Sequence, residues 1–298
     1  MSEVELLPFE MTDMPLFPFA IVCGQRGTGK TLFLQNWLSE NVHHAHTAMH
    51  YLVCGNPAVR DAWSGFIHPL FHYSLENGLN QLVQIVDRQK KVLRMHRNEQ
   101  VPPNRQVVIV LDDVGSNRSI MHSRVMAYLA TAGRHLCISV FITLQYLVQV
   151  PPEIRANIDL LCVMNTQNEN MRKSIHREFV SSIPWRQFLA KLEGATRDYG
   201  ALMVTQKCNV EREKLCTALR YGFPDHARLG GEQMLAYADR HFLDVSDSGL
   251  SHASSSAVLV DDVDREALQS IIGRVYRFSD KQGDIVVRER RMCKLKMA

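Results

Sequence analysis

The feature that most constrains this chain is the segment GQRGTGKT at residues 24–31, which fits the pattern G-x-x-x-x-G-K-[ST]. An apolar, β-rich run at 19–23 precedes it, and a helical pattern over 30–42 follows it. Glycines between a strand and a helix let backbone N–H groups surround phosphate oxygens, while the helix N-terminus faces the anion. The segment therefore predicts a site for the phosphates of a nucleotide, formed by Gly24, Gln25, Arg26, Gly27, Thr28, Gly29, Lys30 and Thr31.

The last two residues of this loop have separate expected roles. The Lys30 ammonium reaches the β- and γ-phosphates, and the Thr31 hydroxyl is placed to hold Mg²⁺. We therefore expect ATP and Mg²⁺ to be the cofactors.

A second acidic site follows the apolar run QVVIVLDD at 106–113. An Asp at the end of such a strand completes the Mg²⁺ shell in enzymes with this loop, which is the role expected for Asp112. Asp113 could act as a general base on the attacking water. Neighbours on an ideal strand point to opposite faces, so both carboxylates serve one site only if the strand ends there. The alternative is that Asp113 caps the next turn.

The stretch 131–167 supplies further candidates. Gln145 comes just after the apolar strand expected at 137–143, where its amide could touch the γ-phosphate and report hydrolysis. Arg134 and Arg155 lie near strand and helix ends, and either could act on a neighbouring subunit as an arginine finger, with Arg155 as the first choice. The alternatives are a solvated loop amide and ordinary surface arginines.

Apolar strands alternate with helical patterns through most of the chain, which predicts an α/β fold with a mainly parallel sheet covered by helices on both faces. We expect the last strand of this sheet at 199–204. The expected division is an N-terminal segment at 1–17, an ATPase domain at 18–222 and a small C-terminal extension at 223–298. The extension contains helical patterns at 231–243 and 262–276, a Ser-rich linker at 246–256 and a basic tail at 288–296.

Composition and charge bear on which classes of protein this chain can belong to. Hydrophobic residues make up 46%, which excludes wholesale disorder, and the net charge of +3 is too small for a global attraction to nucleic acid. The seven cysteines contain no C-x-x-C pair, so we expect free thiols. No signal peptide or apolar run of about 20 residues is visible, which predicts a protein that is not secreted and has no integral membrane segment. No further cluster of metal-ligating residues with suitable spacing follows HHAH at 43–46, so we expect this segment to be a solvated loop.

Several of these motifs together resemble a known family. GQRGTGKT, VVIVLDD, GRH, the strand before Gln145 and PPEIRANID, in this order, are similar to the genome-packaging ATPases of large nucleocytoplasmic DNA viruses, including the poxvirus type. These belong to the FtsK–HerA superfamily of P-loop NTPases with a RecA/ASCE-like sheet. The resemblance covers roughly residues 18–222. Superfamily members often carry Asp-Glu where this chain has Asp112 and Asp113, whereas the virus-type members resemble this chain.

The resemblance implies a fold and a function. The strand before Gln145 should lie between the strand before the phosphate loop and the strand that ends in Asp112. The protein should form a ring, expected to be a hexamer, that threads double-stranded DNA into a capsid and meets a capsid or membrane-vertex protein. The expected locations are viral assembly sites in the host cytoplasm, the nucleus or the virion. The basic tail at 288–296 could contact DNA, a capsid partner or an import receptor, or simply aid solubility.

Two other functions fit the same motifs. GQRGTGK also fits the loop of nucleotide and metabolite kinases, although no arginine-rich lid is evident. An assembly protein gated by ATP would bind the nucleotide and turn it over negligibly. Phosphate release with and without DNA distinguishes these alternatives from a motor.

Overall fold

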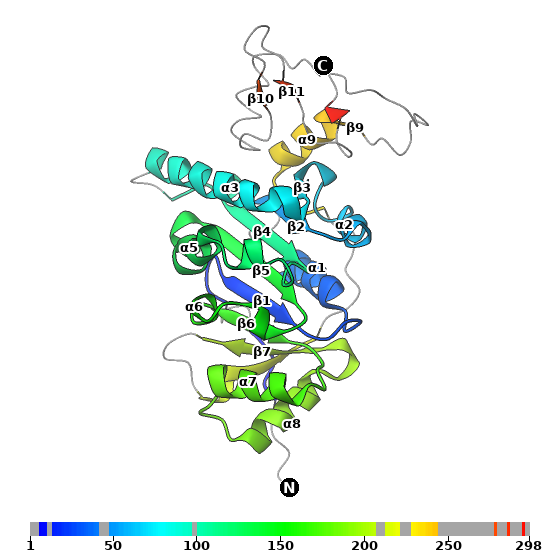
Figure 1. Cartoon of the computed structure of the whole chain (residues 1–298), viewed down its shortest axis with the longest axis vertical. Coiled ribbons are helices and arrows are strands. Elements are labelled where there is room, and N and C mark those ends of the chain that lie inside the picture. Colours follow the sequence, from blue (N-terminus) through cyan, green and yellow to red (C-terminus); the bar gives the residue numbers. More distant parts are fainter. Residues whose placement is uncertain are drawn as a thin grey trace.

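An eight-stranded sheet forms the centre of the molecule, here given as a computed structural model that describes residues 6–10, 14–41, 48–96, 100–206, 212–220 and 228–243 and three two-residue strands between 277 and 295. The strands of the sheet are β1 Phe19–Cys23, β2 Met49–Cys54, β3 His72–Tyr73, β4 Val107–Asp112, β5 Ile138–Leu144, β6 Leu160–Val163, β7 Ala201–Thr205 and β8 Cys216–Leu219. Their order is β3-β2-β4-β5-β1-β6-β7-β8 (Figure 1).

Six of these strands, β3 to β6 in the sheet order, run parallel to one another. Every residue of β1, β2, β4 and β5 is buried, which explains why these strands are continuous apolar runs in the sequence. β5 lies between β1 and β4, so the expected strand order around the phosphate loop is confirmed. The loop after β1, the carboxylates after β4 and Gln145 after β5 consequently lie at one edge of the sheet.

The other end of the sheet is antiparallel. β7 pairs antiparallel with β6, and β8 pairs antiparallel with β7, so the expectation that the strand near 199–204 would be the last was wrong. β8 is only four residues long and was too short to stand out as a strand. Its outer edge is covered by the N-terminal segment, because Phe9 N donates to Ala218 O (2.8 Å) and Ala218 N donates to Leu7 O (2.8 Å).

Helices cover both faces of the sheet. They are α1 Lys30–Asn41, α2 Pro57–Trp63, α3 Leu75–Met95, α4 Arg118–Met121, α5 Arg124–Ala132, α6 Pro152–Arg155, α7 Glu169–Phe179, α8 Trp185–Ala195 and α9 Glu232–His241. Short 3-10 turns are η3 Pro69–Phe71, η4 Pro103–Arg105, η5 Gly133–Leu136, η6 Leu147–Gln149, η7 Arg197–Tyr199 and η8 Arg212–Leu215. In Figure 1, α3, α5 and α6 lie on one side of the central strands, and α1 and α2 lie on the other. This is the arrangement that right-handed crossovers require for this strand order.

Two helical regions show how side chains set the local structure. In α1, Phe33 is buried, whereas its neighbour Leu32 is 43% exposed. The stretch between β4 and η5 contains two helices, α4 and α5. Ser123 separates them because its side chain accepts a hydrogen bond from Met126 N (3.2 Å) and caps the second helix.

Part of the expected C-terminal extension packs on the sheet domain. Leu229 N donates to Phe66 O (2.7 Å), and α9 buries Met234 and Tyr237 in the same hydrophobic core as the strands. Further along, β9 Phe242–Leu243 pairs with β12 Lys294–Leu295, and β10 Arg277–Phe278 pairs with β11 Ile285–Val286. The Ser-rich linker, the helix expected at 262–276, and HHAH at 43–46 lie outside the described residues.

Within the described part of the chain, no helix combines the length and the apolar character needed to cross a membrane. The cysteines described there, Cys23, Cys54, Cys137, Cys162 and Cys216, are free thiols, as expected from their spacing. Burial raises the pKa of the Cys23 thiol to about 12, which suits a packing role.

Candidate active site

The loop between β1 and α1 has the backbone that its glycines allow. Gly27 and Gly29 have φ angles of 80° and 82°, in the left-handed region that side chains disfavour. Gly24 lies against Met164, and a Cβ added at Gly24 would stand 2.8 Å from the Met164 Cβ. The loop is therefore packed tightly against the end of β6, while Arg26 is exposed at its tip.

Lys30 folds back over this loop. Its Nζ donates to Gly24 O (3.0 Å) and to Gln25 O (2.9 Å). Burial lowers the pKa of Lys30, and the nearby Asp113 carboxylate is the largest of the charges that oppose this shift. A phosphate anion bound in the loop would add negative charge beside Nζ and favour the protonated form.

Asp112 ends β4 and is 2% exposed. Its Oδ2 atom accepts hydrogen bonds from Thr31 Oγ1 (2.9 Å) and from Trp63 Nε1 (2.6 Å). Its Oδ1 atom accepts a hydrogen bond from Thr143 Oγ1. Donors from α1, α2 and β5 thus meet on one buried carboxylate, as a buried charge requires.

Asp113 lies just beyond the strand and has a φ angle of 54°. This left-handed turn, which Asp tolerates better than most residues, lets it leave the strand direction. Its backbone N donates to Thr143 Oγ1 (2.9 Å), and its Oδ1 is 3.5 Å from Gln145 Nε2. The strand ends between Asp112 and Asp113. The condition stated from the sequence, under which both carboxylates can serve one site, is therefore met.

The segment that carries Gln145 is held against the loop after β4. Tyr146 N donates to Gln149 Oε1 (3.2 Å). That oxygen lies so close to Gly115 that a Cβ added there would stand 2.5 Å away. The absence of a side chain at Gly115 therefore sets how closely the two loops approach.

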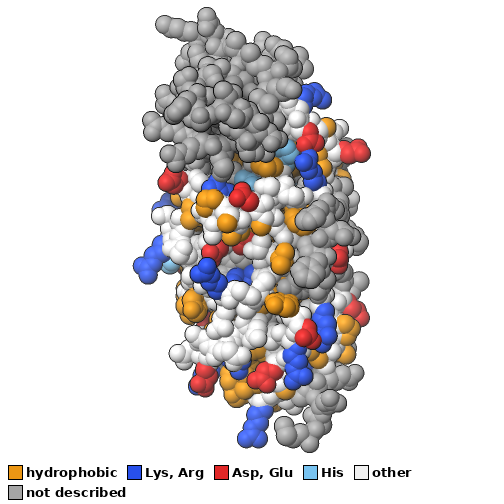
Figure 2. All heavy atoms as spheres, turned by 90° about the vertical axis from the view of Figure 1, so that its right-hand side faces the viewer, with side chains coloured by type: hydrophobic (Ala, Val, Ile, Leu, Met, Phe, Trp, Pro, Cys, Tyr) orange, Lys and Arg blue, Asp and Glu red, His pale blue; other side chains and the backbone are white. Residues whose placement is uncertain are grey.

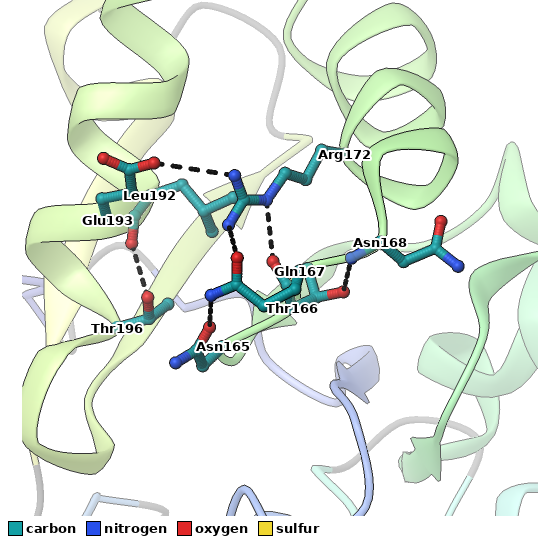
Figure 3. Close-up of polar contacts among 8 residues, drawn as sticks. All are labelled: Asn165, Thr166, Gln167, Asn168, Arg172, Leu192, Glu193 and Thr196. Carbon is teal, nitrogen blue, oxygen red and sulfur yellow. Dashed lines mark hydrogen bonds and ion pairs between the residues drawn. The ribbon is translucent and has the colours of Figure 1, made fainter.

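On the opposite side of the phosphate loop, Arg172 organises the segment after β6 (Figure 3). Gln25 N is 3.5 Å from its acceptor Asn165 O, which joins this segment to the phosphate loop. The Arg172 guanidinium donates to Thr166 O (2.7 Å) and Gln167 Oε1 (3.2 Å) and pairs with Glu193 of α8 (3.6 Å). Arg172 thereby connects α7 and α8 to the segment after β6, which contacts the phosphate loop.

Arg134 and Arg155 do not join this group of residues. Arg134 precedes β5, at the edge of the sheet opposite the phosphate loop, and its guanidinium lies 3.4 Å from Asp159, with the side chain 52% exposed. Arg155 pairs with Glu178 of α7 (2.8 Å), donates to Val150 O (2.8 Å) and is 17% exposed. Each arginine has partners within its own chain.

Three residues of the site were missed in the sequence. Thr143 could have been found, because it is a polar residue near the end of an otherwise apolar strand. Trp63 lies in a short helix with no motif, and Arg172 lies in a helix rich in charged residues, so no sequence signal distinguishes either.

The donor set suits a small divalent cation. Thr31 Oγ1 and the Asp112 carboxylate are oxygens only 2.9 Å apart, and oxygen is the donor that Mg²⁺ prefers. Among the described residues, no group of three His, Cys, Asp or Glu side chains could hold a metal by itself. A site that also uses nucleotide oxygens fits these two observations.

The mainly parallel sheet, the glycine-rich loop before α1 and the two carboxylates at the end of β4 define a P-loop NTPase of the RecA/ASCE type. Residues 8–217 match the poxvirus A32 protein family, and the chain belongs to it. The resemblance to viral packaging ATPases seen in the motifs is thus confirmed.

Several individual proteins are similar to this chain. The chain is 28% identical over 185 residues to the uncharacterised protein 075L of Invertebrate iridescent virus 6, covering 62% of this chain and 69% of that one. It is 21% identical over 184 residues to protein 015R of Frog virus 3, covering 62% of this chain and 55% of that one. Among solved structures, the DNA-packaging ATPase B204 of Sulfolobus turreted icosahedral virus superposes with a TM-score of 0.52 at 13% identity, covering 70% of this chain and 100% of B204. At 13% identity, this similarity shows a shared fold.

Proposed function

We propose that this protein is an ATP-hydrolysing motor that moves double-stranded viral DNA into a capsid, acting as a ring, expected to be hexameric, at viral assembly sites. The observation that carries the proposal is the meeting of Lys30, Thr31, Asp112, Asp113 and Gln145 at one edge of the sheet. Membership of the poxvirus A32 family supports the packaging role.

The residues divide the work of hydrolysis. Lys30 and the loop N–H groups bind the β- and γ-phosphates, while Thr31 and Asp112 hold Mg²⁺. When bound, Mg²⁺ supplies positive charge that offsets the phosphate charge. Asp113, exposed beside Lys30, accepts a proton from the attacking water as a general base.

Gln145 connects this chemistry to movement. Its amide lies at hydrogen-bond range from Asp113, and its segment continues into η6 and α6. An amide that contacts the γ-phosphate changes its partner when that phosphate leaves, so the segment after β5 can report hydrolysis. Two exposed apolar side chains, Tyr146 (44%) and Val148 (72%), belong to this segment.

Charged side chains of both signs are mixed on the face of the molecule that Figure 2 presents. Figure 2 shows basic and acidic side chains interspersed with hydrophobic ones over the described part of the face it presents. This agrees with the small net charge of +3. The small net charge and this mixed face favour contact with DNA through particular segments of a ring.

The test is phosphate release measured with and without double-stranded DNA, together with the oligomeric mass. A motor should have the mass of a ring and should hydrolyse ATP faster when double-stranded DNA is present. Lys30→Ala is the control, because loss of the ammonium removes charge compensation in the ground and transition states and abolishes turnover. Release that requires a small phosphate acceptor would identify a kinase, and ATP binding with negligible turnover would identify a gated assembly protein.

A further inference from the structure

Trp63 reaches the proposed magnesium site from a helix that carries no motif. It is the last residue of α2, its side chain is fully buried, and its Nε1 donates to Asp112 Oδ2 at 2.6 Å. The same oxygen accepts the Thr31 hydroxyl at 2.9 Å. The tryptophan therefore shares one carboxylate oxygen with the residue that ends the phosphate loop.

The indole differs from the other two donors to Asp112. Thr31 and Thr143 donate through hydroxyl groups, whose hydrogens rotate and which can also accept hydrogen bonds. An indole N–H can only donate, and its direction is fixed by the ring. The Trp63 ring packs edge-on against Phe66, with centroids 6.3 Å apart. The indole thus fixes where Oδ2 must lie.

The end of α2 is itself anchored to α1. Gln35, which is 1% exposed and lies one turn after Thr31, donates through Nε2 to Ala62 O at 2.8 Å. The adjacent residues Ala62 and Trp63 thus bind one to α1 and the other to the end of β4. These bonds hold the helix carrying Thr31 and the strand carrying Asp112 at a set separation.

We propose that Trp63 is a positioning residue for Mg²⁺: it fixes the Asp112 carboxylate in the orientation in which this group and Thr31 hold the ion with the nucleotide. The inference rests on the proposed function only in that Thr31 and Asp112 are the magnesium ligands. Removal of a group that hydrogen-bonds to a metal ligand and orients it typically lowers metal affinity by about 10–100-fold.

The chain offers a matched control. Trp37 is also fully buried, packing against Phe33 and edge-on against Phe141 (5.2 Å). Within the described ranges its Nε1 has no hydrogen-bond partner. Trp63→Phe and Trp37→Phe both remove an indole from the core, but only the first removes a donor to Asp112.

The experiment measures binding of a non-hydrolysable ATP analogue to the full chain by calorimetry, with and without Mg²⁺. We expect Trp63→Phe to keep its affinity for the metal-free analogue and to lose about 10–100-fold of the enhancement given by Mg²⁺. Trp37→Phe should keep that enhancement. A wild-type level of enhancement in folded Trp63→Phe would overturn the positioning role. No enhancement in the wild-type protein would instead overturn the proposed magnesium site itself.

A second measurement does not require Trp63→Phe to fold. The chain has three tryptophans, Trp37, Trp63 and Trp185, and therefore three indole N–H resonances, which the Trp37→Phe and Trp185→Phe proteins assign. With the analogue bound, Mg²⁺ should shift the Trp63 indole resonance of the wild-type protein and leave that of Trp37 in place. An unmoved Trp63 resonance in a protein that binds Mg²⁺ would contradict the inference.

Discussion

Asp112 and Asp113 are neighbours in the sequence but lie in opposite environments. Asp112 is buried and holds its hydrogen bonds to Thr31, Trp63 and Thr143, whereas Asp113 is exposed next to Lys30 and Gln145. A carboxylate fixed by several donors suits metal binding. An exposed one with room for a water suits proton transfer.

These environments predict different defects for the two amide variants. Asp113→Asn should bind the Mg²⁺ complex of a non-hydrolysable analogue normally while hydrolysis falls by about 10²-fold or more. Asp112→Asn should require a higher Mg²⁺ concentration for any remaining turnover, because an amide NH₂ replaces an oxygen that faces donors. Magnesium titrations of both variants, with calorimetry of analogue binding, make the comparison. Identical titrations for the two variants would remove the reason for giving them different roles.

His72 predicts how stability depends on pH. Burial is the main cause that lowers its pKa to about 4, with smaller contributions from the charges of His68 and Arg60, and the hydrogen bond to Ile67 O (2.8 Å) opposes the shift. The unfolded chain takes up a proton near pH 6.5, whereas the folded chain does so only near pH 4. Stability is therefore lost as the pH falls from about 6.5 to about 4, by about 3 kcal/mol in all.

The measurement is the free energy of unfolding in urea between pH 4 and pH 8. His72→Gln keeps a donor for Ile67 O but no titrating ring, so its stability should fall less steeply over this range. His122→Gln, at an exposed position, is the control and should follow the wild-type curve. A wild-type slope in His72→Gln would assign the acid sensitivity to other groups.

At the scale of elements, the segment after β6 depends on α7. Arg172→Met removes the donors to Thr166 O and Gln167 Oε1 while keeping a long side chain. Because this segment contacts the phosphate loop through Asn165 O, we expect affinity for ATP to fall by about fivefold, the effect of one lost hydrogen bond of about 1 kcal/mol. Analogue binding followed by fluorescence tests this.

The control is Arg177→Met on the same helix. Arg177 is 76% exposed and pairs with Glu178, the next residue (3.4 Å), so its loss should not change nucleotide binding. Equal affinities for both variants and the wild-type protein would show that Arg172 stabilises α7 and α8 without affecting the site.

The sequence predicted the elements that are both apolar and attached to motifs. β1, β4 and β5 are buried on both faces, so nearly every residue in them is apolar and their limits are visible within one residue. β3, with two residues, and β8, with four, are too short to form a pattern. The antiparallel direction of β7 depends on the path of α7 and α8, which local sequence does not contain.

The site residues that could be predicted are those whose residue type and spacing indicate their chemistry. Glycine, lysine and aspartate at fixed spacing carry their chemistry in their identity, so Lys30, Thr31 and Asp112 could be selected without a structure. Trp63 acts through one N–H placed by tertiary packing. Any buried tryptophan looks the same in sequence, as Trp37 shows, and only the fold distinguishes the two.

At the scale of the whole molecule, the proposed ring makes one prediction about its arginines. The bonding partners described for Arg134 and Arg155 lie outside the phosphate loop of their own chain, as expected for a residue that acts on a neighbouring subunit. Arg155 was the first choice from the sequence, but it is 17% exposed and paired with Glu178, whereas Arg134 is 52% exposed. A guanidinium that reaches another subunit must be accessible, so exposure favours Arg134.

Removal of the acting arginine should lower the rate of hydrolysis by about 10³-fold, because a guanidinium at the transferring phosphoryl group stabilises its charge. Mixed rings then identify the subunit on which it acts. A Lys30→Ala subunit still presents its arginine to a neighbour, and an Arg134→Ala subunit still has an intact phosphate loop. Rings that contain both should regain part of the activity, measured as phosphate release against the mixing ratio. Normal hydrolysis by assembled rings of Arg134→Ala and of Arg155→Ala would exclude both residues. An inactive variant that mixing never rescues would place that arginine's role within its own subunit.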